Sequence, residues 1–147
     1  MRTDALDVVW YTDDLRTTDH EGLVSAMASG NPVIAVHVTS PTEAGEGPFG
    51  FPEVGIHRRR FVASALLDLK ERLHALGVPL HLFIGDDVSM FQRLDAFGPI
   101  RTIHVERSDD DVMISRQDAV RKSLGKDALI IHDTRTMINP DDLPFAL

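Results

Sequence analysis

The 147-residue sequence contains no cysteine, which excludes disulfide bonds, thiolate metal sites and a cysteine nucleophile. A chain without cysteine fits a reducing compartment, so we expect a cytoplasmic protein. No uninterrupted apolar run approaches the ~20 residues that cross a bilayer, and the N-terminus has neither a long apolar stretch nor a small-residue cleavage site. We therefore expect neither a membrane protein nor an exported one.

Basic residues are also few, with 15 Lys and Arg against 23 Asp and Glu, a net charge of −8. Binding to a phosphate backbone depends on Lys and Arg that displace counterions, so the chain is not expected to bind DNA alone. Its length suits one domain that buries roughly 70% of the surface of the unfolded chain.

Short apolar runs alternate with helical patterns along the whole chain, which is typical of strands joined by crossover helices. The alternation predicts an α/β fold, a Rossmann-like open parallel five-stranded sheet with helices on both faces. The expected strands cover residues 8–11, 33–38, 80–84, 102–105 and 128–132.

The helices have recognisable ends. Thr18 and Glu21 have the spacing of a capping box, and Gly30 can stop the helix that follows. A long helix begins near His57 and ends at Gly77, because leucines recur there at alternating spacings of four and three residues. Two further helices are expected, one lined by Val88, Phe91 and Leu94 and one over residues 112–124.

Residues 39–56 form the only long irregular segment, and they contain Gly45, Gly47 and Gly50 at the spacing G-x-G-x-x-G. A dinucleotide-binding loop would leave a strand directly and enter a helix. Here the glycines begin well after the strand and Pro48 interrupts them, so we expect a flexible connection or a functional loop of another kind.

This segment continues as FGFPEVG at residues 49–55, with Arg58 and Phe61 following, and it resembles the F-G-F-P-x-x-G-x-x-R-x-x-F segment of the DASH branch of the cryptochrome/photolyase family. Residues 9–21, VWYTDDLRTTDHE, are similar to the family's opening V-W-F-R-N-D-L-R-x-x-D-N-E, in which asparagine stands where this chain has His20. Residues 139–145, NPDDLPF, are similar to the family's H-x-D-D-L-P-F close. The resemblance covers nearly the whole chain and implies the family's N-terminal α/β domain as a single domain over residues 1–147.

In that family, light-driven repair and photoreception depend on FAD in a second, helical domain, and this sequence ends where that domain would begin. Electron transfer to a flavin also needs a series of redox-active aromatic residues, whereas the chain has only Trp10 and Tyr11 of these kinds. We therefore expect no FAD site here and no photolyase activity of the chain alone.

The resemblance further implies that the domain can hold an antenna pigment, commonly a folate, in a crevice at the carboxyl ends of the strands. Arg16 and Arg58 match family arginines and can pair with an anionic pigment tail or with a carboxylate such as Asp14. The first arginine of the family's R-N-D-L-R is replaced by Thr12.

After the fourth strand, DASH members tend to have a Lys-Glu pair whose Glu bonds the pterin. Arg107 and Ser108 occupy those positions here. A serine cannot supply a charged acceptor, so pigment binding requires Glu106 or Asp109 to substitute.

Two classes of function follow. The chain is a pigment-binding or protein-interaction module, pairing with itself or with an FAD-bearing protein through the face that would meet the helical domain. Alternatively, it is the N-terminal part of a split or truncated photolyase that needs such a partner for blue-light sensing or repair. An unrelated nucleotide-binding enzyme is a third reading.

The remaining polar groups suggest structural roles. The acidic runs at residues 86–87 and 109–111 precede helices, which favours capping over magnesium binding. Basic residues 57–60 begin the long helix at the unfavourable end of its dipole, so we expect a compensating acid such as Glu53 or a partner. His37 and His132 are expected to be satisfied strand residues, since no histidines have metal-ligand spacing.

Overall fold

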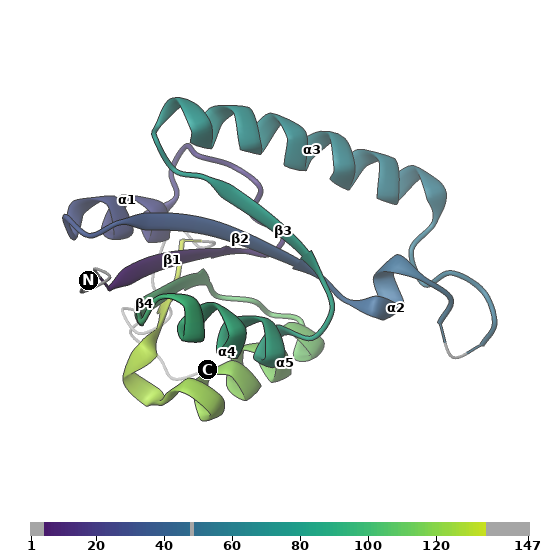
Figure 1. The fold of residues 1–147 in the computed structure, drawn as a ribbon. Helices are drawn as coiled ribbons and strands as arrows, with labels where there is room; N and C mark the ends of the chain where they lie inside the picture. The colour runs from purple at the N-terminus through teal and green to yellow at the C-terminus, as the bar shows by residue number, and fades with distance from the viewer. Residues whose placement is uncertain (1–4, 48, 135–147) are drawn as a thin grey trace, which may run out of the picture.

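The computed structural model describes residues 5–47 and 49–134, and these form one parallel sheet of five strands in the order β3-β2-β1-β4-β5 (Figure 1). The predicted fold class is therefore confirmed. The family-like segment at residues 139–145 lies outside the described residues. The strands are β1 (Leu6–Tyr11), β2 (Val33–Thr39), β3 (Leu80–Ile84), β4 (Ile100–Glu106) and β5 (Leu129–His132).

Helices cover both faces of the sheet, because each parallel connection must cross from one end of the sheet to the other. They are α1 (Glu21–Ala28), α2 (Pro41–Ala44), α3 (Ile56–Ala75), α4 (Asp87–Phe97) and α5 (Asp111–Leu124), with a 3₁₀ turn at Lys126–Ala128. Figure 1 shows α4 and α5 below the sheet and α3 above it. Within the part of the chain that the structure describes, no helix is both long and apolar enough to cross a membrane.

Two apolar cores follow from the alternation of side chains along the central strand β1. Val8 and Trp10 pack with Phe91 of α4 on one face of the sheet. Val9 and Tyr11 pack with α1 and α3 on the other face. Every one of these side chains is fully buried, so β1 is the strand around which both layers are organised.

The start of α1 differs from the sequence prediction. The helix begins at Glu21 and His20 is its N-cap, with Nδ1 accepting a hydrogen bond from the Leu23 N–H at 3.0 Å. The predicted capping box of Thr18 and Glu21 is therefore wrong. Histidine is not among the usual capping residues, which explains why the sequence pattern favoured threonine. Gly30 has the predicted left-handed conformation, with a φ of 77°.

The irregular segment contains one short helix that the sequence analysis missed. In α2, Ser40 and Glu43 form a reciprocal capping box, with Pro41 in the first turn. The S-x-x-E spacing with proline was the available signal. The three glycines follow α2 and do not open a helix, which agrees with rejecting a dinucleotide loop.

The long helix α3 extends beyond the sheet. Its buried residues, Leu66, Leu69 and Leu73, all lie in its second half. The first half carries the basic cluster at residues 57–60, and the acidic side chain expected to compensate this cluster is not found among the described residues. Arg59 instead donates to the Gly45 carbonyl at 3.1 Å, which ties α3 to the end of α2.

Candidate functional site

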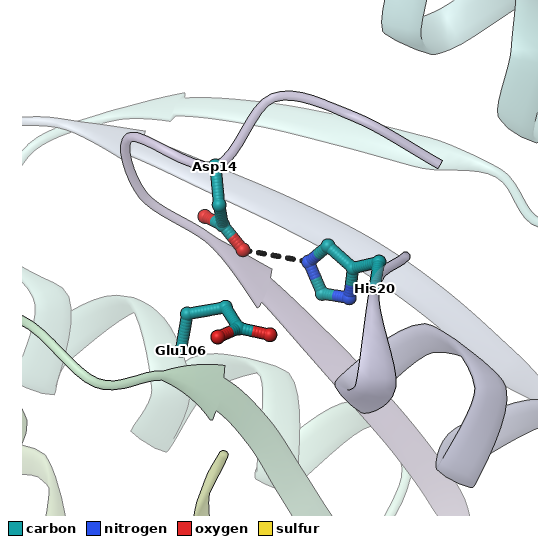
Figure 2. A group of neighbouring side chains, drawn as sticks. All are labelled: Asp14, His20 and Glu106. Carbon is teal, nitrogen blue, oxygen red and sulfur yellow. Dashed lines mark hydrogen bonds and ion pairs between the residues drawn. The ribbon is translucent and has the colours of Figure 1, made fainter. Parts of the chain in front are cut away.

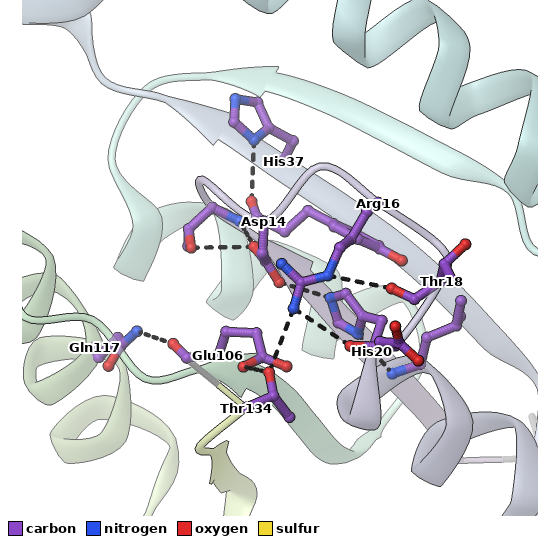
Figure 3. A network of polar contacts seen from close by, with 12 residues as sticks. Asp14, Arg16, Thr18, His20, His37, Glu106, Gln117 and Thr134 are labelled. Carbon is purple, nitrogen blue, oxygen red and sulfur yellow. Dashed lines mark hydrogen bonds and ion pairs between the residues drawn. The ribbon is translucent and has the colours of Figure 1, made fainter. Parts of the chain in front are cut away.

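The candidate site lies at the carboxyl ends of β1 and β4. In the sheet, β2 lies on one side of β1 and β4 lies on the other side. The connection after β1 leads to β2, and the connection after β4 leads away from β1 to β5, so the two connections diverge between β1 and β4. Open α/β sheets bind ligands at such a switch point. Its polar side chains come from the loop after β1, the last residue of β4 and the residues after β5 (Figure 3).

Asp14 and His20 form the innermost pair. The Oδ2 atom of Asp14 lies 2.6 Å from Nε2 of His20, and both side chains are buried. Since His20 Nδ1 accepts the Leu23 N–H, the ring proton is on Nε2 and is donated to Asp14. Burial alone would raise the pKa of Asp14, but the hydrogen bonds from His20 and the Thr12 N–H outweigh it and lower that pKa. Asp14 is therefore a stable buried carboxylate.

Glu106 is the second buried carboxylate, with 1% of its surface exposed. Thr134 donates to its Oε2 atom at 2.6 Å, and Arg16 donates in turn to the Thr134 hydroxyl at 3.5 Å. The Oε1 atom of Glu106 is buried and has no hydrogen-bond partner among the described residues. A buried acceptor without a partner costs about 1–3 kcal/mol, so this oxygen is poised for a donor.

Tyr11 supplies a matching unpaired group on the same face of the sheet. Its hydroxyl is buried and lacks a partner within the described chain. Burial, with the negative charges of Asp14 and Glu106, raises the pKa of Tyr11 and outweighs the opposing charge of Arg16. The phenol therefore stays protonated and can donate a hydrogen bond.

Asp14, His20 and Glu106 together have the residue types of a metal site, and one ligand atom from each lies within 4.8 Å of the others (Figure 2). A zinc-type ion needs a free imidazole lone pair. In His20, Nδ1 accepts the backbone N–H of α1 and Nε2 carries the proton given to Asp14. A metal would have to displace one of these two hydrogen bonds, so the geometry favours a hydrogen-bonded cluster over a metal centre.

A pocket of about 620 Å³ opens beside this cluster. That volume is in the range of small-molecule sites. Arg16, whose side chain is exposed, forms part of its wall and is held by the Thr18 and Asp19 carbonyls at 3.2 and 3.3 Å. The pocket is lined by Arg16, Thr18, Asp19, His20, Glu21, Val24 and Thr134.

The structure brings together only some of the predicted site residues. Glu106 and Arg16 share Thr134 as a common partner, so these two predicted residues do meet. Arg16 does not pair with Asp14, because Asp14 is already bonded to His20 and Thr12. Of the two kinds of partner that the sequence suggested for Arg16, the Asp14 carboxylate is therefore not the one that the structure shows.

Two of the other predicted residues have local partners. Arg107 pairs with Asp133 at 2.8 Å, and the buried Ser108 accepts the Asp110 N–H at 3.2 Å where α5 begins. Arg58 is exposed in the first turn of α3, and no hydrogen bond or ion pair joins it to the cluster within the described ranges.

Sequence reasoning missed His20, Tyr11 and Thr134 as members of the site. The available signal for His20 was its position, where the family's opening motif has asparagine. Thr134 carried no signal, since its role depends on β5 lying next to β4.

The acidic pair 86–87 has the structural role that the sequence favoured. Asp86 caps α4 by accepting the Ser89 N–H at 2.8 Å. Both carboxylate oxygens of Asp87 accept from Arg116, at 2.6 and 2.9 Å, which leaves little room for a cation. Asp110 likewise caps α5.

Known proteins resemble the chain both in sequence and in fold. A cryptochrome DASH from Gloeobacter violaceus is 33% identical over 143 residues, which cover 95% of this chain and 28% of that protein. The solved structure of a Synechocystis cryptochrome superposes with a TM-score of 0.86 at 25% identity, over 99% of this chain and 31% of that one.

An archaeal photolyase from Sulfolobus tokodaii, solved with two FAD molecules and described as implying a novel light-harvesting cofactor, shares the fold with a TM-score of 0.72 at 23% identity, over 87% of this chain and 28% of that one. The chain thus spans less than a third of the length of these proteins. The sequence pattern of DNA photolyase matches residues 7–146. This match includes every strand of the sheet except the first residue of β1, and the chain therefore belongs to the DNA photolyase family, with the N-terminal α/β fold of its cryptochrome and photolyase members.

Proposed function

We propose that the chain is a small-ligand-binding domain that holds a folate-type antenna pigment at the carboxyl edge of the sheet, between β1 and β4. The observation that carries this proposal is the Oε1 atom of Glu106, a buried carboxylate oxygen without a partner among the described residues. It lies at the switch point of the sheet, where ligands of this fold class bind.

The chemistry of the site suits a heterocycle with a donating edge and an anionic tail. Glu106 accepts an N–H of the ring, and the protonated Tyr11 hydroxyl donates to a ring carbonyl or nitrogen. The exposed guanidinium of Arg16 binds a carboxylate of the tail, since its present acceptors are only carbonyls and a hydroxyl. Both buried groups require a small local opening, because neither reaches the surface.

Glu106 takes the part that the resemblance assigned to a glutamate at position 108. Ser108 is engaged at the start of α5 and Arg107 is held by Asp133, so neither is free to replace it.

Absorption spectroscopy tests the proposal. Protein purified under dim light, with and without added reduced folate, is expected to show a protein-bound band in the near-ultraviolet or blue that survives gel filtration. Glu106→Gln and Arg16→Gln should each weaken binding at least about tenfold, the effect of losing one charge-assisted hydrogen bond. Arg101→Gln is the control, since Arg101 pairs with Asp7 near the amino ends of β1 and β4, at the other end of these strands from the site. The absence of a bound band, or equal weakening by the control, would contradict the proposal.

A second role is favoured by the exposed aromatic side chains of the family-like segment. Phe49 and Phe51 stack with ring centroids 6.2 Å apart and are exposed, as is Phe61 of α3. We infer that this surface binds an FAD-bearing helical partner, with which the chain would act in light sensing or repair. Titration with the helical domain of the Gloeobacter relative, followed by flavin fluorescence, tests this role. Phe51→Ser with Phe61→Ser should abolish the response, and no response from the unaltered chain would overturn the inference.

A further inference from the structure

The start of α3 carries a cluster of basic residues that the described chain leaves unpaired. His57, Arg58 and Arg60 are exposed, and no hydrogen bond or ion pair engages their side chains among the described residues. The first turn of α3 contains no acidic residue, so the positive charges lie at the positive end of the helix dipole. Cations at that end destabilise a helix. The cluster is therefore unfavourable for the isolated chain.

The acidic side chains that precede α3 are turned elsewhere. A Cβ atom on Gly47 would lie 2.6 Å from Cγ of Glu53, so the Glu53 side chain packs against the turn at residues 47–51. Glu43 is engaged in the capping box of α2 with Ser40. Within the described ranges, neither carboxylate forms an ion pair with the basic cluster. Of the two expected sources of compensating charge, Glu53 and a partner, the structure thus leaves the partner.

Exposed aromatic rings flank the same charges. Phe49 and Phe51 are 80% and 62% exposed, and Phe61, which is 72% exposed, lies one helical turn after Arg58. The hydrogen bond from Arg59 to a carbonyl at the end of α2 holds the segment with the first two rings against the start of α3. Figure 1 shows this segment and the start of α3 together beyond the end of the sheet. We call this group the basic–aromatic surface, and its members are Phe49, Phe51, Arg58, Arg60 and Phe61.

We propose that the basic–aromatic surface binds an acidic segment of a partner protein, in which carboxylates alternate with apolar side chains. The carboxylates pair with Arg58 and Arg60, and the apolar side chains pack on the three rings. Arginine and aromatic residues are the types enriched at the centres of protein interfaces. This inference rests on the second role proposed above for the place of the partner, and it adds the chemistry by which that partner is recognised.

Charge complementarity decides the kind of partner. The chain has a net charge of −8, so an anionic partner is attracted to the basic–aromatic surface and repelled by much of the remaining surface. A short acidic segment meets both conditions, because it need extend no further than the surface that binds it. A nucleic acid is disfavoured, since its phosphates continue past the basic residues and tight binding requires many of them to be neutralised. Salt should weaken the complex by screening the attraction.

Fluorescence anisotropy with labelled peptides tests the proposal without the helical domain. The probes are a peptide of repeated Glu-Phe-Glu-Ala units and one in which serine replaces each phenylalanine. The unaltered chain is expected to bind the first peptide more tightly, and Phe51→Ser with Phe61→Ser should remove that preference. Arg58→Glu with Arg60→Glu should weaken binding at least about tenfold. The matched control is Lys122→Glu with Lys126→Glu, which makes the same change in net charge at exposed positions near the end of α5 and should bind as the unaltered chain does.

Several outcomes would overturn the proposal. These are no binding of the phenylalanine peptide, binding that salt does not weaken, and equal weakening by the two pairs of charge reversals. Tighter binding of single-stranded oligothymidine would make the surface a nucleic-acid site instead. Self-association of the unaltered chain that Arg58→Glu with Arg60→Glu abolishes would make the occupant a second copy.

The helical domain of the Gloeobacter relative separates this inference from the second role. If that domain binds and the charge reversal at Arg58 and Arg60 leaves its affinity unchanged, the second role stands and the acidic partner is refuted. If that domain does not bind while the phenylalanine peptide does, the second role fails and the preference for an acidic segment is supported.

Discussion

Nδ1 of His104 lies 3.0 Å from Nε2 of His132, and the two rings stack with centroids 5.2 Å apart beneath the start of α1. Both side chains are buried on adjacent strands, and His132 is further approached by Glu21 at 3.8 Å. This confirms that His132 is a satisfied strand residue, although its partner is another histidine. His37 is satisfied separately by the Tyr11 carbonyl at 3.0 Å.

Two buried histidines, His104 and His37, predict how the free energy of unfolding depends on pH. Burial, with the neighbouring His132, lowers the pKa of His104, and burial lowers that of His37. The unfolded chain therefore binds protons first as the pH falls, so the free energy of unfolding should decrease below a pH of about 6.5, by about 1.4 kcal/mol per pH unit for each proton. Urea unfolding at a series of pH values should show that the free energy of unfolding changes less steeply with pH in His104→Gln than in the unaltered chain. Identical slopes would show that His104 does not contribute.

Gly22 predicts a packing effect at the same place. A Cβ atom at Gly22 would lie 3.3 Å from the Cβ of His104, 3.3 Å from Cε1 of His20 and 3.4 Å from Cδ2 of His132. Gly22→Ala should lower the free energy of unfolding by about 1–3 kcal/mol through overpacking, although alanine is the better helix former. Denaturant unfolding should be measured for Gly22→Ala and for Ala28→Gly, which makes the reverse change at an exposed position of α1. A stabilised Gly22→Ala protein would contradict the packing argument.

His20 predicts a graded loss of stability. His20→Asn, which introduces the residue of the family motif, keeps an N-cap but removes the donor to Asp14, so we expect a loss of about 1–3 kcal/mol. His20→Ala also removes the cap and should cost about 1 kcal/mol more. Thermal and urea unfolding measure the stability of both variants. If His20→Ala and His20→Asn lost the same stability, the ring would not cap α1.

Arg116 predicts the largest single loss. Its guanidinium is bonded to both oxygens of Asp87 and to the Val38 carbonyl, and both side chains of the ion pair are largely buried. Arg116→Met leaves Asp87 as a buried charge without its partner and should destabilise the protein by about 3–5 kcal/mol. In urea unfolding, the double variant Arg116→Met/Asp87→Ala should recover part of that loss. Additive losses would mean that the two residues are not coupled.

The elements with strong periodicity could be predicted from the sequence, and the polar site could be predicted only in part. The third strand was predicted with the observed bounds. The leucine spacing and Gly77 predicted where the long helix stops, and α3 ends at Ala75, two residues before Gly77, which has a φ of 76°. Glu106 was proposed because a charged acceptor was needed near the end of the fourth strand. Its partner Thr134 is distant in sequence and meets it only because β5 pairs with β4.

The pairing of Asp14 with His20 could not be predicted for a related reason. Asp14 had several possible partners in the same loop, and only the path of residues 12–20 brings the His20 ring to its carboxylate. Arg59 shows the same limit, since its partner is a backbone carbonyl that no side-chain pattern reveals.

The central position of β1 also has a consequence for folding during synthesis. β1 can pair with β2 as soon as residue 39 has left the ribosome, but its other neighbour, β4, ends at residue 106. Until then, one edge of the most completely buried strand of the sheet has no partner, and long-range parallel pairing of this kind is slow. Nascent chains that stop before β4 should therefore aggregate or recruit chaperones, whereas chains that include β5 should be released as soluble protein.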